Sequence, residues 1–556
     1  MPFNIQRQRS VDMRLNTWNN VVGYLQFAGF AIIAVALSFS NFFMSFGMFW
    51  LAVVLVLQIA GDLYQKQSVL LRWKRFTSNT SAIVLSTLIL LPVAGLLWTS
   101  NYNHAFWDIR MKLPLLVLPL LISGLNPLTQ GQFRALTGIF ILGVAVAVLF
   151  CLQTYWLGSP EIDKDVRKIS LFISHVRFSL LIALAFGLLV SYAYSTIQGI
   201  ILIMLFAIPS FYFLYVIGSV TGICALAAMT IWCSFHIAAR KNSFYTKLIA
   251  FSVPVILCSL SLMYIMQSYK DYFTLKYVSA QPVVTHTPRG AVYNHHVDYP
   301  LIENGRLVYS FVAEEELYEA WYDRSTMHLD SIDGRGHALK GTLIRYLTSK
   351  DLRKDADGVA SLTQEDVLAI ERGIPTIIEP TQHGLSRRLS RIFFEWSNYR
   401  AGGSPDGHSV IQRLEFWKTA WLIIRRNMWT GVGTGDIKSA FQEGYMERNS
   451  TLSERYRLRA HNQYLTMWAT YGLVGLAFFL CIIFWPLFTA SRSDINVQMI
   501  VLLVALSFFT EDTLESQAGV MFMAYFYSMF TAKKSLSLFE LRRPKQKAAL
   551  LSSDAL

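Results

Sequence analysis

Two adjacent polar residues, His461 and Asn462, open an apolar run that extends to about Phe488. An ionisable group at the mouth of a membrane span is costly to desolvate, so such a group is a candidate for function. A neutral imidazole there would serve as a general base towards a hydroxyl group. A lone histidine would more often only anchor a helix end at the membrane interface. Here Arg413 and a glycine-rich run precede the histidine, which favours chemistry.

The elements around this pair follow a fixed order along the chain. They are Arg413-Leu-Glu-Phe-Trp417, then Gly431-Val-Gly-Thr-Gly435, then the His-Asn pair, then Gly472 and Gly475. The glycine-rich run lacks the Gly-Lys-Ser/Thr of a nucleotide-binding loop. It therefore offers either backbone N–H groups to a phosphate or no more than a tight turn.

Three carboxylates, Glu511, Asp512 and Glu515, cluster just before the last apolar run. Paired carboxylates can perform acid–base chemistry. The sequence shows no partner residues for these carboxylates. We therefore interpret them as helix caps or as partners of arginines, and acid–base chemistry is the alternative.

The composition places the chain in a membrane. Of its 556 residues, 53% are hydrophobic and only 15% are charged, whereas soluble domains carry roughly 25% charged residues. The net charge of +13 is typical of basic cytoplasmic loops that face anionic lipid, so nucleic acid need not be invoked as a partner. The five cysteines all fall in apolar runs and form no Cys-x-x-Cys pair, which argues against a disulfide framework and a zinc site.

About twelve apolar runs are candidates to cross a bilayer, which requires about 20 residues per helix. The fourth and eleventh are short and are expected to be tilted, broken or re-entrant. The pattern predicts an all-α polytopic membrane protein with spans at 20–38, 41–60, 81–98, 113–126, 136–157, 171–194, 199–217, 220–237, 248–267, 464–488, 498–511 and 517–532.

Basic residues between the spans predict the orientation. With the N-terminus in the cytoplasm, most of the basic loops lie inside, including Arg72, Lys74, Arg75, Arg134, Arg240, Lys247 and Arg492. One external loop breaks the pattern with Lys164, Arg167 and Lys168, partly offset by its own acidic residues. Both termini are therefore expected in the cytoplasm.

The spans divide the chain into four parts. Residues 1–267 would hold the first nine helices, 268–463 a large external loop domain, 464–532 the last three helices and 533–556 a basic cytoplasmic tail.

The external loop has the sequence of a small, mostly helical domain. Short helices are predicted around 311–321, 341–347 and 362–373. The last of these has Thr363 as its N-cap and Gly373 as its stop signal.

The ordered series of motifs resembles the O-antigen ligase family, which also includes O-antigen polymerases and bacterial protein O-oligosaccharyltransferases. The C-terminal signature covers residues 411–531, and the layout of spans extends the likeness over most of the chain. Loop stretches 342–350 and 352–358 look like the variant found in Bacteroidetes-type members. The resemblance implies a membrane glycosyltransferase fold of the GT-C type.

The resemblance also implies a reaction and its residues. Family members move a glycan from undecaprenyl diphosphate to an acceptor, such as lipid A core, at the periplasmic face of the bacterial inner membrane. The family's catalytic base corresponds to His461, and the loop arginine that grips the lipid diphosphate corresponds to Arg413. A second family arginine is absent, because Val220 stands in its place. Arg177 is a candidate replacement, and a merely snorkelling arginine is the alternative.

Displacement at an anomeric carbon passes through an oxocarbenium-like state. The departing diphosphate needs cationic donors, a task that suits the planar fork of arginine. Lys112 and Arg459 are weaker cationic candidates, Asn462 would orient the imidazole or the acceptor, and Glu511 and Glu515 are supporting candidates. A base on one face and a leaving group on the other predict inversion, with no metal, nucleotide or other cofactor required.

Three reactions remain open within the family: ligation to lipid A core, which we favour, polymerisation of repeat units, and transfer to protein. A secondary transporter or flippase is the alternative from another class, because twelve spans suit it as well. Against it, the spans show no obvious internal repeat and carry few buried acids for ion coupling.

Overall fold

The computed structural model describes residues 2–65, 68–158, 166–240, 243–276, 284–296, 298–378 and 384–532. Within these ranges, nine helical segments are long and apolar enough to cross a membrane. An all-α polytopic membrane architecture is therefore confirmed. The expected basic tail, 533–556, lies outside the described residues.

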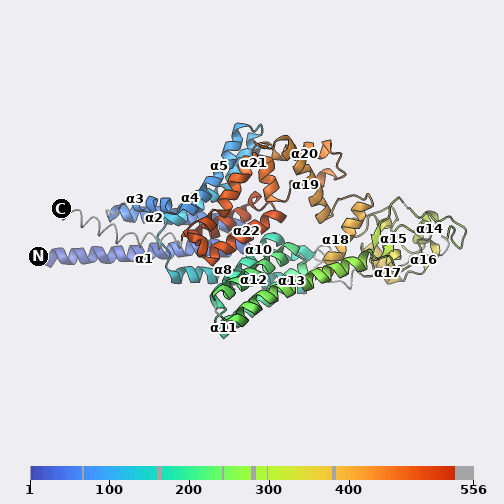
Figure 1. The fold of residues 1–556 in the computed structure, drawn as a ribbon, viewed down its shortest axis with the longest axis horizontal. Helices are drawn as coiled ribbons and strands as arrows, with labels where there is room; N and C mark the ends of the chain where they lie inside the picture. Colours follow the sequence, from blue (N-terminus) through green and yellow to red (C-terminus); the bar gives the residue numbers. More distant parts are fainter. Residues whose placement is uncertain are drawn as a thin grey trace.

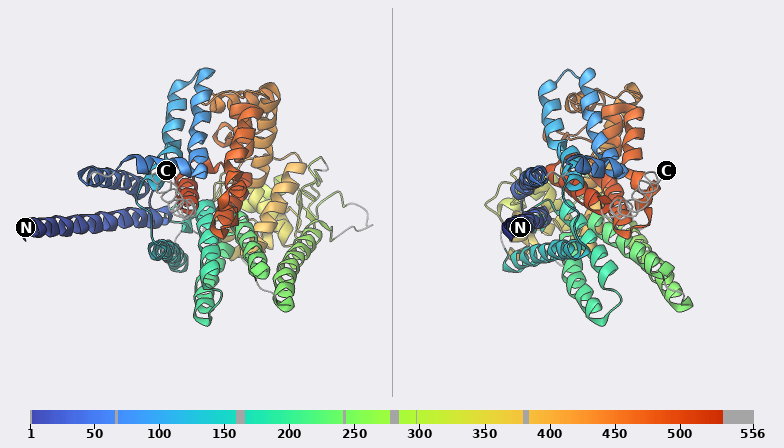
Figure 2. Two further views of the ribbon diagram at one scale, coloured as in Figure 1. Left: turned by 60° about the vertical axis from the view of Figure 1, so that its left-hand side comes forward. Right: turned by 90° about the vertical axis from the view of Figure 1, so that its left-hand side faces the viewer.

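The first part of the chain supplies most of the spanning helices. Its elements are α1 (Pro2–Phe39), α2 (Asn41–Tyr64), α3 (Leu70–Ser78), α4 (Thr80–Ser86), η1 (Thr87–Ile89), α5 (Leu90–Ala94), η2 (Gly95–Leu97), α6 (Tyr102–Lys112), α7 (Pro114–Gly124), α8 (Gln130–Leu157), η3 (Val166–Ile169), α10 (His175–Ala193), α11 (Ile197–Ile217), α12 (Val220–Arg240) and α13 (Phe244–Phe273). In Figures 1 and 2, α11 projects on the opposite side of the molecule from α5 and α21.

The third predicted span is confirmed as a helix, Thr80–Leu97, which contains 3-10 turns. It consists of α4, η1, α5 and η2 in succession. The hydroxyl of Ser86 donates to the carbonyl of Ala82, and that of Thr87 to the carbonyl of Val84. Such back-bonding bends helices, and Pro92 further along removes a backbone donor. No pattern in the sequence predicts these 3-10 turns.

The fourth predicted span is short, as expected. Its helix, α7, has 11 residues, and at about 1.5 Å per residue it is too short to cross a hydrocarbon core of about 30 Å alone. Pro114 begins it, where a missing N–H costs nothing. The preceding helix, α6, ends at Lys112 and places that residue beside the C-terminal part of the chain.

The segment between α13 and α18 contains a small folded unit with its own core. Its elements are β1 (Ile302–Glu303), β2 (Arg306–Leu307), α14 (Glu314–Tyr322), α15 (Leu339–Ser349), α16 (Ala356–Ala360) and α17 (Gln364–Glu371). The two short strands pair antiparallel. Trp321, Leu343 and Val367 are among the fully buried residues at its centre. Figure 1 shows α14–α17 at one end of the molecule, far from the start of α1.

The three helices predicted in this domain are confirmed as α14, α15 and α17. The hydroxyl of Thr363 accepts from the backbone N–H of Asp366, and the carboxylate of Asp366 accepts from the N–H of Thr363. This reciprocal pair is a capping box. Gly373 has a φ of +82° after the helix ends, as its stop signal predicts.

The last part of the chain returns to the membrane bundle. Its elements are α18 (Gly384–Arg400), α19 (Ser409–Arg426), α20 (Ile437–Glu447), η5 (Glu454–Tyr456), α21 (Gln463–Phe484), η6 (Trp485–Phe488), η7 (Ala490–Ser493), α22 (Ile495–Thr510) and η8 (Thr513–Glu515). Residues 517–532 form a further helix.

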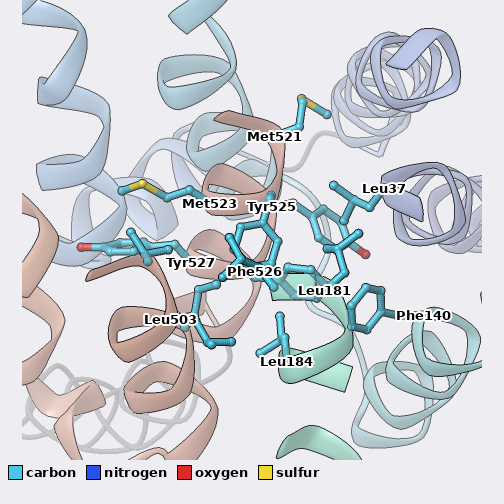
Figure 3. Close-up of a cluster of buried hydrophobic side chains, with 14 of the residues drawn as sticks. Leu37, Phe140, Leu181, Leu184, Leu503, Met521, Met523, Tyr525, Phe526 and Tyr527 are labelled. Atoms are coloured by element: carbon cyan, nitrogen blue, oxygen red, sulfur yellow. The ribbon is translucent and has the colours of Figure 1, made fainter. Parts of the chain in front are cut away.

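This final helix is the centre of the membrane core, because nearly all its side chains are buried. Figure 3 shows its side chains meeting those of α1, α8, α10 and α22, with Leu37, Phe140, Leu181, Leu184, Leu503, Met521, Met523, Tyr525, Phe526 and Tyr527 labelled. Buried tyrosines need partners for their hydroxyls. Tyr525 donates to the carbonyl of Phe30 and Tyr527 to that of Ile482. The helix that follows the carboxylate cluster is thus firmly held.

Candidate functional site

His461 lies directly before α21 in an uncommon backbone conformation. Its φ is +46°, in the left-handed region that non-glycine residues seldom adopt. Its backbone N–H donates to Oδ2 of Asp512 at 3.0 Å. Its ring stacks on Phe416 of α19, with centroids 5.6 Å apart. The loop is therefore held from two sides, and the imidazole is fixed in direction.

Asn462 caps α21. Its side-chain oxygen accepts from the backbone N–H of Leu465 at 3.1 Å, as an N-cap should. Its amide nitrogen donates to the carbonyl of Phe509 at 3.2 Å. These contacts fasten the start of α21 to the end of α22. Both contacts of Asn462 are with backbone atoms, so this residue positions the histidine loop and does not contact the imidazole through them.

Glu511 bridges the histidine and the loop arginine. One carboxylate oxygen, Oε2, lies 3.4 Å from Nδ1 of His461. The other, Oε1, accepts from Nη2 of Arg413 at 3.1 Å. Arg413 is 28% exposed and His461 35% exposed at the side chain, so both are reachable from outside. Glu511 was predicted only as a supporting residue, because no sequence motif near it indicates a contact with His461 or Arg413.

Arg177, in the first turn of α10, belongs to the same electrostatic environment. Burial alone would raise the pKa of Glu511. The hydrogen bond with His461 and the electrostatic interactions with His461, Arg413 and Arg177 outweigh burial and hold that pKa below its usual range. The two predicted arginines and the predicted base therefore all act on one ionised carboxylate.

A second charged network lies beneath this group. The ammonium of Lys112 lies 2.8 Å from Asp108 and 2.9 Å from Oε1 of Glu515, and the guanidinium of Arg459 donates to Oε2 of Glu515 at 2.8 Å. The side chains of Lys112, Asp108 and Glu515 are only 5% exposed. Burial alone would raise the pKa of Glu515, but Lys112 and Arg459 outweigh it and lower that pKa well below its usual range.

This network ties α6 to η8 and to the histidine loop. Lys112 and Arg459 are both occupied by carboxylates of the chain itself, so their contacts fit a positioning role better than phosphate binding. Asp512 completes the support. Its Oδ1 accepts from the hydroxyl of Thr466 at 2.6 Å, while its Oδ2 holds the backbone of His461.

The glycine-rich run packs against a kink in α21. Gly472 interrupts that helix with a φ of +69°. The backbone N–H groups of Val432 and Gly433 donate to the carbonyls of Ala469 and Thr470. A Cβ added at Gly431 would lie 2.3 Å from the backbone of Thr470. These glycines therefore allow two backbones to approach closely, which favours the tight-turn interpretation over phosphate binding.

Val220 begins α12 at the same end of the bundle as Arg177. The neighbouring Ser219 lies 3.1 Å from Ser179 of α10, measured between their hydroxyl oxygens. Arg388 of α18 packs beside Gly218, at the end of α11. Its guanidinium donates to the hydroxyl of Ser409 at 2.8 Å. Arg388 was missed from the sequence, because only the packing of α18 against α11 brings it there.

Phe416 was also missed, although the sequence held a signal for it. It follows Arg413 by three residues on α19, so both side chains share one helix face. The arginine and the aromatic platform under the imidazole therefore come from a single short motif.

Comparison with known protein families agrees with the family resemblance of the motifs. Residues 381–480 match a family model described as O-Antigen ligase. The match contains Arg413, Phe416 and His461, but ends before Glu511. A search of curated proteins finds no match. The matched segment covers α18 to α20 and most of α21. Residues 381–480 are therefore similar to the O-antigen ligase family, in agreement with the resemblance of the motifs.

Proposed function

We propose that this protein transfers a glycan from undecaprenyl diphosphate to an acceptor hydroxyl at the periplasmic face of the bacterial inner membrane. Lipid A core is the acceptor that we favour. The observation that carries the proposal is the shared contact of His461 and Arg413 with Glu511. The proposed base and the proposed phosphate-binding cation therefore share one carboxylate, and both side chains are partly exposed.

In the proposed reaction, His461 takes the proton of the acceptor hydroxyl. Its Nδ1 faces Glu511, so an Nδ1–H tautomer leaves Nε2 free to accept that proton. The carboxylate of Glu511 then stabilises the imidazolium that forms, as the buried aspartate does in the serine-protease triad. The 3.4 Å separation would shorten once substrate is bound.

The bond changes follow a single displacement. The acceptor oxygen attacks the anomeric carbon as the bond from that carbon to the diphosphate oxygen breaks. The electron pair of the broken bond stays on the diphosphate. Arg413 and Arg177 stabilise the negative charge that develops there. Attack opposite to the leaving group inverts the configuration at the anomeric carbon.

The pairing of Arg413 with Glu511 leaves capacity for a phosphate. The contact uses one terminal nitrogen of the guanidinium, and the fork carries five N–H donors in all. Glu511 thereby orients the arginine without using all its donors. The same carboxylate aligns both the base and the cation, so donor and acceptor would be positioned relative to each other.

The test uses purified protein and a lipid-linked glycan donor, offered with lipid A core or with a Ser/Thr-containing protein. We expect the glycan on lipid A core. Longer lipid-linked chains would instead identify a polymerase, and glycosylated protein a protein O-oligosaccharyltransferase. Movement of the donor across vesicles without any bond formation would contradict the proposal and favour a transporter.

A further inference from the structure

The side of α19 that faces away from the protein is aromatic. Trp417 and Trp421 of α19 are 36% and 47% exposed, and Trp429, just past its end, is 64% exposed. The opposite side of the helix is buried and includes Ala420 and Ile424. A tryptophan combines a large apolar ring with one N–H donor, and such side chains are enriched at membrane–water interfaces. Three exposed tryptophans on and beside one helix therefore point to a lipid surface.

This aromatic side of α19 adjoins α21, which is long and apolar enough to span a membrane. The ring of Trp421 meets that of Trp468 of α21 edge-on, with centroids 5.7 Å apart. Nε1 of Trp468 also donates to the carbonyl of Met428 at 3.3 Å. Figure 1 shows α19 beside α21 and away from α14–α17. The exposed tryptophans of α19 thus continue the surface of a helix whose own exposed apolar side chains, Val474 and Phe478, suit contact with hydrocarbon.

Arginines lie at the C-terminal end of the same aromatic side. Arg425 follows Trp421 by four residues, so both side chains lie on one face of the helix, and both are exposed. Arg426 forms an ion pair with Glu447 of α20. Tryptophan beside arginine on the exposed side of an amphipathic helix is typical of helices that lie in a membrane interface. The guanidinium can then meet the phosphates of lipid headgroups while the ring contacts the acyl chains.

The short helix α6 repeats this pattern next to α20. Tyr102, Phe106 and Arg110 recur at intervals of four residues, and all three are exposed. The chain just before α6 is fastened to the start of α20, because the backbone N–H of Ser100 donates to Oδ2 of Asp436 at 2.7 Å. With 11 residues, α6 is too short to cross a hydrocarbon core of about 30 Å. Its exposed aromatic face suits a helix that lies along the membrane surface.

We propose that the exposed aromatic sides of α6 and α19 dock on the membrane interface, with their rings among the headgroups and upper acyl chains of its phospholipids. Part of the segment 268–463, expected from the sequence as an external loop domain, would then belong to the membrane surface. Because α19 also carries Arg413 and Phe416, docking would hold the candidate site at the depth of the headgroups. The inference goes beyond the proposed function, because it concerns a lipid surface and does not depend on glycan transfer.

The test places a photoreactive side chain at one exposed aromatic position at a time, in the full-length protein reconstituted into vesicles of phosphatidylethanolamine and phosphatidylglycerol. Trp421→p-benzoylphenylalanine and Trp429→p-benzoylphenylalanine probe the proposed surface. The same replacement at exposed Phe211 of the apolar helix α11 is the positive control, and that at exposed Tyr322 of α14 is the negative control. Mass spectrometry of the illuminated protein then measures phospholipid adducts at each position.

We expect adducts at Trp421 and Trp429 at least about tenfold above those at Tyr322 and within about threefold of those at Phe211, because rings in the interface are surrounded by lipid. Adducts at both positions no more abundant than at Tyr322 would overturn the proposal. Cross-links to a second copy of the chain in place of lipid would overturn it as well, because the surface would then be a protein interface.

A second measurement keeps a natural ring at the probed position, in case the photoreactive variants fold poorly. Trp421→Phe should lower the fraction of tryptophan fluorescence that brominated phospholipid quenches, since one lipid-exposed indole is removed. A quenched fraction that does not fall below that of the wild type would contradict the proposal. Both measurements are made without a glycan donor, so their results are independent of whether the protein transfers a glycan.

Discussion

Nδ1 of His461 lies 3.4 Å from Oε2 of Glu511, although the two residues are 50 positions apart in the sequence. The contact joins the loop before α21 to the end of α22. Because Arg413 binds the other oxygen of the same carboxylate, Glu511 connects the proposed base to the proposed phosphate ligand. It thereby gives the site its shape.

Glu511→Gln should impair transfer without preventing assembly. The amide is of similar size but cannot stabilise an imidazolium or hold Arg413 by charge. We expect the turnover rate to fall about 100-fold, within the usual range for loss of general-base assistance. The assay follows glycan transfer by the purified protein. Exposed Glu365 in the loop domain provides the matched control, Glu365→Gln. Equal rates for the two variants would show that Glu511 is not needed for the reaction.

Arg177→Gln should lower kcat/KM for the lipid-linked donor about tenfold or more, because one charged donor to the diphosphate is lost. Val220 begins the helix next to α10, at the same end of the bundle. The double variant Arg177→Gln with Val220→Arg should therefore recover part of the lost activity. Full activity of Arg177→Gln alone would identify Arg177 as a snorkelling residue.

Lys112→Met should destabilise the protein through the buried network. It leaves the carboxylates of Asp108 and Glu515 without their shared cation in a nearly water-free place. Removing one partner of a buried ion pair lowers the free energy of unfolding by about 3–5 kcal/mol. The measurement is thermal unfolding of the detergent-solubilised protein. Lys438→Met, at an exposed lysine of α20, should leave the melting temperature unchanged. A melting temperature of Lys112→Met equal to this control would contradict the structural role.

Gly472→Ala should disturb the kink of α21. An added Cβ would lie 2.1 Å from the backbone carbonyl oxygen of Trp429, and the φ of +69° is unfavourable for alanine. We expect a loss of about 3 kcal/mol or more in unfolding free energy, seen as reduced yield and a lower melting temperature. Gly138→Ala in α8 is the control, because no atom lies within 4 Å of its added Cβ. Similar behaviour of both variants would argue against close backbone packing at the kink.

Much of the fold is readable in the sequence, because its signals are local. The apolar runs predict the helices, and the N-cap Thr363 with Gly373 predicts α17 almost to its ends. The short fourth span is also visible as a short apolar run. The 3-10 turns within the third span are not visible, since they accompany hydroxyl groups that bond back to their own helix.

The site is only partly readable for the same reason. His461 and Arg413 are recognisable by their motifs, yet their common partner Glu511 follows a different helix. Glu511, Asp512 and Glu515 look alike in the sequence, but they perform three tasks. Glu511 faces the imidazole, Asp512 holds its backbone, and Glu515 neutralises the buried network. Only the return of α22 beside α21 separates these roles.

The most direct test of the account is glycan transfer by His461→Ala, measured alongside undecaprenyl monophosphate binding and membrane insertion. We expect the variant to insert and to bind the lipid, while its transfer rate falls at least about 100-fold because the proposed base for the acceptor proton is lost. Transfer at a rate close to that of the wild type would contradict it and remove the imidazole from the reaction.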